Sequence, residues 1–165
     1  MLTRARRSLP TATAVAALGA VTALMGGCTD APAVSEPPAD ATLDGVVVQV
    51  AQTETCGCCG EWVAYVEEHG AEVEVTYVDD LAPVKDAAGI PDGLASCHTA
   101  TVAGYTVEGH VPVAAIADLL EQAPAIDGIT LPGMPAGSPG MPGVPEAPFE
   151  VASFTDGVVA LFGRY

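Results

Sequence analysis

The alternation of hydrophobic and polar positions predicts a mixed α/β domain over residues 46–165. Residues 46–50 form a short β-branched run with turn residues on both sides, which is typical of a buried strand. Residues 73–77 alternate between apolar and polar side chains, as a half-buried strand does. Between them, residues 60–69 place apolar side chains on one helical side, and Gly70 follows as a helix C-cap. The front of the domain is therefore expected to run strand, helix, strand.

The second half of the domain continues this alternation. Asp156-Gly157 between two apolar runs is a strong hairpin signal. Pro112 suits the first turn of a helix, because its missing N–H has no intrahelical partner there. The expected elements are a short helix at 80–88, strands at 99–103 and 105–108, a helix at 112–122, and strands at 149–154 and 158–162.

Residues 124–148 differ in kind, since they hold 7 Pro and 5 Gly in 25 positions. Such a composition is incompatible with a helix or an inner strand, so we expect a loop. Strand, cysteine loop, helix and strand at the front of the domain suggest a thioredoxin-like fold. The predicted fold class is an α/β, thioredoxin-like sandwich with a Pro/Gly/Met-rich loop and a C-terminal β-hairpin.

The length and the net charge of the chain limit the classes of function that it can have. A chain of 165 residues that is 50% hydrophobic can form one domain with a real core. Its 21 acidic and 5 basic residues give a net charge of −16, which argues against electrostatic binding to nucleic acid or anionic lipid. The sequence contains no phosphate-binding loop, dinucleotide fingerprint or nucleophile–base–acid set. An acidic surface that collects cations and one that is simply solvated both fit this composition.

The pattern of the first 28 residues predicts an export signal. A basic start and an uncharged stretch at 10–25 lead to Met25-Gly-Gly-Cys28, which resembles a bacterial lipobox. We expect a lipoprotein signal peptide at 1–27, lipid attachment at Cys28 and a flexible tether at 28–45. The protein would then be anchored in the cell envelope outside the cytoplasmic membrane. A membrane span is the alternative, but the apolar stretch is shorter than the ~20 residues required.

With Cys28 assigned to lipid attachment, four cysteines remain that can bind a metal or exchange disulfides. Cys56, Cys58 and Cys59 lie directly before the first predicted helix, and Cys97 precedes the strand at 99–103. Amides at a helix start lower a thiol's pKa and favour the thiolate. Crowded thiols fit redox exchange or soft-metal binding. The alternative is a disulfide framework, but a bridge within four residues restricts the unfolded chain little.

Two histidines and two methionines extend this set. His98 follows Cys97, and His110 precedes the helix at 112–122, although each could be an ordinary surface or hydrogen-bonded histidine. Met134 and Met141 each occur in the sequence Pro-Gly-Met-Pro, on a loop with no core to fill. Thiolate and thioether together select Cu(I). A Pro-rich spacer with incidental methionines is the alternative.

At these residues the chain resembles the CopG family of bacterial copper-resistance proteins, formerly known only as a domain of unknown function. The resemblance spans about residues 46–165. It is carried by Cys56-Gly-Cys-Cys59 with Trp62, Gly89-Ile-Pro91, Ser96-Cys-His-Thr99, Gly104-Tyr105, Glu108-Gly-His-Val-Pro112, Leu131-Pro-Gly-Met-Pro135 and Gly137-Ser-Pro-Gly-Met141.

The resemblance implies a thioredoxin-like fold whose cysteines Cys56, Cys58, Cys59 and Cys97 hold a copper–thiolate cluster in the envelope. It further implies a role in copper tolerance, with interconversion of Cu(I) and Cu(II). The candidate metal ligands are these four cysteines with His98, His110, Met134 and Met141, and the expected cofactor is copper as Cu(I), in a site that can be multinuclear. The expected partners are copper ions and other envelope copper-handling proteins.

Two competing functions remain open at this stage. A thiol–disulfide oxidoreductase would use Cys56 and Cys59, but Cys58 beside them would trap mixed disulfides. A binding module with structural disulfides and no metal is the third hypothesis. An enzymatic role, as a copper oxidoreductase, is also open.

Overall fold

The structure is a computed structural model that describes residues 40–165. The predicted signal peptide, Cys28 and most of the predicted tether lie outside the described residues. Within residues 40–165, no helix is long and apolar enough to cross a membrane.

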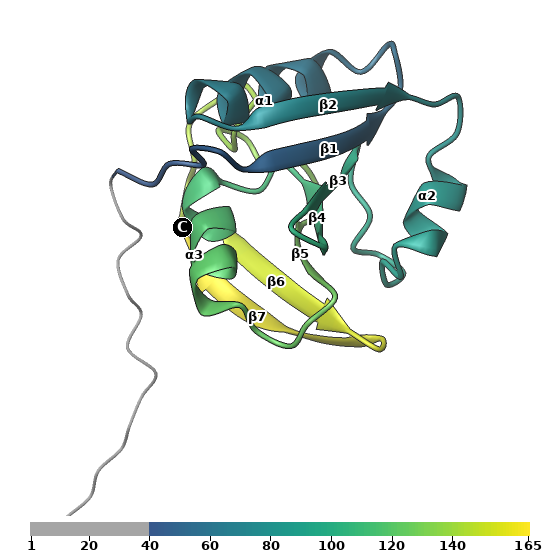
Figure 1. The fold of residues 1–165 in the computed structure, drawn as a ribbon, viewed down its shortest axis with the longest axis vertical. Helices are drawn as coiled ribbons and strands as arrows, with labels where there is room; N and C mark the ends of the chain where they lie inside the picture. The colour runs from purple at the N-terminus through teal and green to yellow at the C-terminus, as the bar shows by residue number, and fades with distance from the viewer. Residues whose placement is uncertain (1–39) are drawn as a thin grey trace, which may run out of the picture. The chain divides into compact units, whose positions relative to one another are not determined.

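A single seven-stranded sheet organises the domain (Figure 1). Its strand order is β2-β1-β3-β4-β5-β6-β7, in which β1 pairs with β2 and β4 with β5 in parallel, while the other neighbours are antiparallel. The strands are β1 (Val47–Gln52), β2 (Glu72–Tyr77), β3 (Thr99–Val102), β4 (Tyr105–Gly109), β5 (Gly128–Leu131), β6 (Glu150–Thr155) and β7 (Val158–Arg164).

Two helices bury the apolar face of this sheet. Side chains of α1 (Gly57–Glu68) and α3 (Val113–Gln122) share one core with alternate residues of β1, β3 and β4. Trp62 and Ile116 are fully buried in that core. The alternation along β1, where Val48 and Val50 are buried and Val47 is exposed, follows the period-two geometry of a strand.

The remaining helix, α2 (Ala82–Ala87), contributes no side chain to that core. Its residues are half-buried or exposed, and with threonine side chains of β3 and β4 they line a groove of about 540 Å³. Thr99 and Thr101 in that groove alternate along β3 with the core residues Ala100 and Val102. The helix α2 therefore stands over the opposite face of the sheet.

The predicted α/β class and the terminal hairpin of β6 and β7 are confirmed. The arrangement is also compatible with a thioredoxin-like core. Leu43, within the range predicted as a tether, is buried, and its N–H donates to the His69 carbonyl at 2.7 Å. The packed part of the chain therefore includes residues before 46.

The prediction that residues 124–148 contain no inner strand was wrong, because β5 runs through them between β4 and β6. All four residues of β5 are buried. The prolines and most glycines of the segment lie outside these four positions, so the average composition concealed a short strand. Gly128 itself is required there, since a Cβ would collide with the Thr106 carbonyl oxygen.

Candidate metal centre

Four cysteine sulfurs converge where the start of α1 meets the segment before β3. The sulfur atoms of Cys56, Cys58, Cys59 and Cys97 all lie within 4.8 Å of one another. We call these four residues the cysteine cluster. These are the same four cysteines for which the family resemblance implied a copper–thiolate cluster.

The cysteines enter the helix earlier than the sequence predicted. Cys56 is the extended N-cap residue of α1, and Gly57 begins the helix, so Cys58 and Cys59 lie in its first turn. Residue 60 was predicted as the start because the apolar pattern begins only at Trp62. The first-turn position places these cysteines beside the free N–H groups of the helix start, which carry a partial positive charge.

The cluster contains one disulfide and two free thiols. Cys56 and Cys59 are joined, while Cys58 and Cys97 are free. The Cys58 sulfur lies 3.6 Å from the Cys56 sulfur and 3.9 Å from the Cys97 sulfur. Two electrons and two protons would return the pair to thiols and leave four thiol sulfurs close together. The cluster therefore combines one disulfide with two further sulfur donors.

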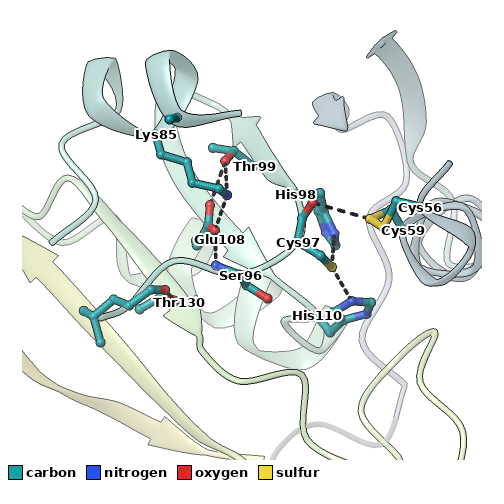
Figure 2. A network of polar contacts seen from close by, with 12 residues as sticks. Cys56, Cys59, Lys85, Ser96, Cys97, His98, Thr99, Glu108, His110 and Thr130 are labelled. Atoms are coloured by element: carbon teal, nitrogen blue, oxygen red, sulfur yellow. Dashed lines mark hydrogen bonds and ion pairs between the residues drawn. A yellow bond between two sulfur atoms is a disulfide. The ribbon is translucent and has the colours of Figure 1, made fainter. Parts of the chain in front are cut away.

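Cys97 belongs to a second group of donors, formed with His98 and His110. Figure 2 shows both rings beside the Cys97 sulfur. His110 Nε2 lies 2.8 Å from that sulfur, and His110 Nδ1 lies 2.6 Å from the Pro139 carbonyl oxygen. A carbonyl can only accept, so Nδ1 carries the proton and the neutral ring presents the Nε2 lone pair to Cys97. Metal-binding histidines are commonly oriented in this way.

His98 is completely buried beside the cluster. Its ring packs against Trp62, with centroids 4.5 Å apart, and its Nδ1 lies 3.5 Å from the Cys97 sulfur. Its Nε2 has no hydrogen-bond partner among residues 40–165. A buried nitrogen without a partner is costly unless it gains one, and a metal ion is one such partner.

Burial sets the protonation of these groups. It raises the pKa of Cys97 to about 12, with the neighbouring Cys58 sulfur acting in the same direction. Burial also lowers the pKa of His98 to about 3, and it lowers the pKa of His110 against the opposing effect of the Pro139 carbonyl. Without metal, Cys97 is therefore a neutral thiol and both imidazoles are neutral bases. A metal ion would displace the Cys97 proton.

The Pro/Gly/Met-rich loop after β5 closes against this centre. Besides the Pro139 carbonyl, Gly140 packs so closely that a Cβ there would lie 2.7 Å from Trp62 N and 2.8 Å from the Cys58 carbonyl oxygen. Met141 follows this contact and is half-buried, whereas Met134 is 39% exposed. The loop thus brings Met141 to the start of α1. Met134 lies on a more exposed part of it.

Sequence reasoning missed the loop residues that orient the candidate ligand His110 and pack against the start of α1. Pro139 acts through its carbonyl and Gly140 through its lack of a side chain, so neither offers a functional group to a motif search. It also missed the buried Glu108 and its partner Lys85, drawn in Figure 2. The available signal was that Lys85 is the only lysine in the chain.

The fold and the site define a class: an α/β domain with a cysteine and histidine centre that can hold metal ions. Two solved structures, described as "Copper resistance protein copG- Form 2" and "Copper resistance protein copG- Form 1", resemble this chain. Each is 37% identical with a TM-score of 0.67 and covers 73% of this chain, which spans 98% and 97% of their lengths. The chain belongs to the CopG family of copper resistance proteins.

Two further comparisons complete this picture. A family described as "Protein of unknown function, DUF411" matches residues 94–141, which include the second donor group and the start of the Met-bearing loop. No curated protein sequence matches the chain.

The neutral state of His98 predicts an acid-sensitive fold in the metal-free protein. Because burial lowers the pKa of His98 from 6.5 to about 3, the unfolded chain binds the extra proton between these values. Stability contributed by neutral His98 is thus complete above about pH 6.5 and decreases as the pH falls toward 3. The expected loss at the acid end is roughly 4–5 kcal/mol.

Denaturant unfolding at several pH values, with a chelator present, measures this slope. The matched variant is His98→Phe, which keeps a ring against Trp62 but cannot bind a proton. Its stability should depend less on pH between 6.5 and 3. Equal slopes for the two proteins would contradict the prediction.

Proposed function

We propose that this protein binds copper as Cu(I) through the cysteine cluster, and that it serves copper resistance as the names of its structural relatives indicate. The observation that carries the proposal is the convergence of four sulfurs on a site that also presents the His110 Nε2 lone pair. Soft thiolate donors favour Cu(I), and imidazole is also a copper ligand.

The donor set supports more than one copper ion. The two groups together contain four cysteines and two histidines, and they share Cys97. A single tetrahedral ion takes four ligands, so six donors exceed what one such ion uses. A shared thiolate can bridge two ions. Met141, next to the contact between the loop and α1, is the better placed thioether, and Met134 is a second candidate.

Cu(I) titration tests the proposal. The protein is the full chain with Cys28→Ser in mild detergent, reduced anaerobically so that the only thiols are those of the cysteine cluster. We expect more than one Cu(I) per chain against a competing chelator, with quenching of the Trp62 fluorescence. Cys97→Ser should lower the affinity by at least about 10–100-fold, because it removes the shared ligand.

The controls separate the ligands. Met141→Leu should weaken Cu(I) binding more than Met134→Leu, since Met141 is half-buried and directly follows the close contact of Gly140 with α1, whereas Met134 is exposed. Failure of the reduced protein to retain any Cu(I), or retention of one Zn(II) in preference to copper, would overturn the proposal.

The Cys56–Cys59 disulfide supports a redox role as well. If both cysteines begin as thiols, two Cu(II) ions can each accept one electron from the pair. The products are two Cu(I) ions, one disulfide and two released protons. Cys58 and Cys97 remain free to hold Cu(I) in the oxidised protein. This chemistry would reduce Cu(II) to Cu(I) at the site.

Addition of Cu(II) to the reduced, metal-free protein tests this step. We expect the paramagnetic Cu(II) signal to disappear, two Cu(I) to form per chain, and peptide mapping to place the new disulfide at Cys56–Cys59. Cys56→Ser and Cys59→Ser should each abolish that disulfide. Persistence of the Cu(II) signal in the reduced wild-type protein would contradict the step.

The same disulfide favours a second candidate function, thiol–disulfide exchange. Its position at a helix N-terminus is suited to exchange, because the helix stabilises a thiolate. Turnover of a model disulfide by the metal-free protein, lost in the same two variants, would favour an oxidoreductase over a copper protein.

We also propose that the protein acts in the cell envelope, tethered through a lipid on Cys28. The support is the sequence alone: a basic start, an uncharged stretch and a lipobox-like Met25-Gly-Gly-Cys28. Detergent phase partitioning of bacterial cells producing the chain measures the anchor. The wild-type protein should enter the detergent phase as a lipid-bearing form, and Cys28→Ser should lack the lipid. Equal masses of the mature amino-terminal peptide, apart from the substitution, would exclude lipidation.

A further inference from the structure

A buried ion pair lies beside the second donor group, on the face of the sheet covered by α2. Glu108 of β4 is fully buried, and Lys85 of α2 has a side chain that is 14% exposed. The Lys85 Nζ atom lies 2.5 Å from Glu108 Oε1. Figure 2 shows that polar contacts connect this ion pair to the segment that carries Cys97.

The Glu108 carboxylate bonds to both residues that flank Cys97 and His98. Its Oε1 accepts the Ser96 backbone N–H at 2.5 Å, and its Oε2 accepts the Thr99 hydroxyl at 2.7 Å. Lys85 Nζ also donates to Thr99 Oγ1 at 3.0 Å. One carboxylate thus joins the two ends of the segment that carries Cys97 and His98.

The strand pairing fixes only one end of this segment. Thr99 lies opposite Glu108 in the β3–β4 register, and Gly109 N–H donates to the His98 carbonyl at 3.1 Å. Ser96 lies before β3, and its buried hydroxyl has no hydrogen-bond partner among residues 40–165. The backbone bond to Glu108 is therefore the hydrogen bond that holds Ser96 itself, and two residues earlier the Thr130 hydroxyl donates to the Leu94 carbonyl at 2.9 Å.

Charge explains why Lys85 is needed. Residues 40–165 contain two basic side chains, Lys85 and Arg164, in a strongly acidic chain. Arg164 forms an exposed pair with Glu150, so Lys85 alone compensates the buried Glu108. A buried carboxylate without a cation would be expensive, and such pairs are weak stabilisers compared with apolar replacements. A role in conformational specificity is the better explanation for retaining the pair.

We propose that Glu108, compensated by Lys85, is a positioning residue that holds the Cys97 sulfur toward the other cysteines. The inference rests on the proposed Cu(I) function. The Cys97 sulfur is 3.9 Å from the Cys58 sulfur and is shared by both donor groups, so a shift of its segment would affect every ion that Cys97 binds. The side chains of Lys85 and Glu108 contact the flanking residues and do not serve as ligands.

The first experiment measures Cu(I) binding in the full chain with Cys28→Ser. Glu108→Gln and Lys85→Met should each weaken Cu(I) binding by about tenfold or more, as loss of an outer-sphere contact does. Lys85→Arg should recover most of the affinity, because it keeps the cation. The double variant should lose less than the product of the two single losses, since both act through one network.

The matched control is Glu150→Gln, which breaks the exposed ion pair and should leave Cu(I) affinity unchanged. Thr99→Val removes one hydroxyl without burying an unpaired charge. It replaces the charge variants as the test of the positioning role if those variants fail to fold. It should weaken binding by a smaller factor. Unchanged copper affinity and stoichiometry in folded Glu108→Gln and Lys85→Met, whatever their melting temperatures, would overturn the proposal.

A second measurement does not depend on copper. In metal-free protein carrying Cys28→Ser, Cys56→Ser and Cys59→Ser, a mild thiol oxidant should join Cys58 to Cys97, because their sulfurs lie 3.9 Å apart. Glu108→Gln should slow this bond several-fold, and Glu150→Gln should not. If wild type bound no Cu(I) but this difference appeared, the proposed function would fail and the positioning role would stand. An equal rate in both variants would refute the positioning role.

Discussion

The contact between the start of α1 and the segment before β3 is the interaction on which the site depends. Cys59 lies in the first turn of α1 and its sulfur is 3.6 Å from the Cys97 carbonyl oxygen. One turn further, Trp62 packs on His98 and donates its Nε1–H to the Val111 carbonyl at 3.0 Å. One buried indole therefore ties the cysteine-bearing helix to both histidine-bearing segments. The convergence of donors is a consequence of core packing.

Burial has two opposite consequences for this centre. It keeps the imidazoles neutral and the Cys97 thiol protonated, so the candidate ligands are bases or become bases on losing a proton. It also makes any charge expensive. The chain places an acidic residue there nonetheless and compensates it with its single lysine. The same low-polarity surroundings that would strengthen metal–thiolate bonding thus require a dedicated ion pair to hold the backbone around Cys97.

The Pro/Gly/Met-rich loop contributes backbone atoms as much as side chains. The Pro139 carbonyl selects the His110 tautomer, and the close approach of Gly140 to α1 brings that carbonyl within reach. A loop rich in proline and glycine suits this purpose, because proline limits its conformations and glycine permits close contact and left-handed backbone. Gly140 has a φ of 80° as well as a crowded Cβ position. The loop that carries the methionine thioethers is therefore also the loop that orients His110.

The sequence alone determined the α/β class, the terminal hairpin, and the positions of the cysteines and histidines that the fold brings together, because periodicity and residue chemistry are local properties. It did not reveal β5, since the four-residue strand lies in a segment whose composition resembles a loop and is held by pairing with β4 and β6. Nor did it reveal the Lys85–Glu108 pair or the Pro139 contact. These join residues 23 and 29 positions apart, and only tertiary packing decides such distances.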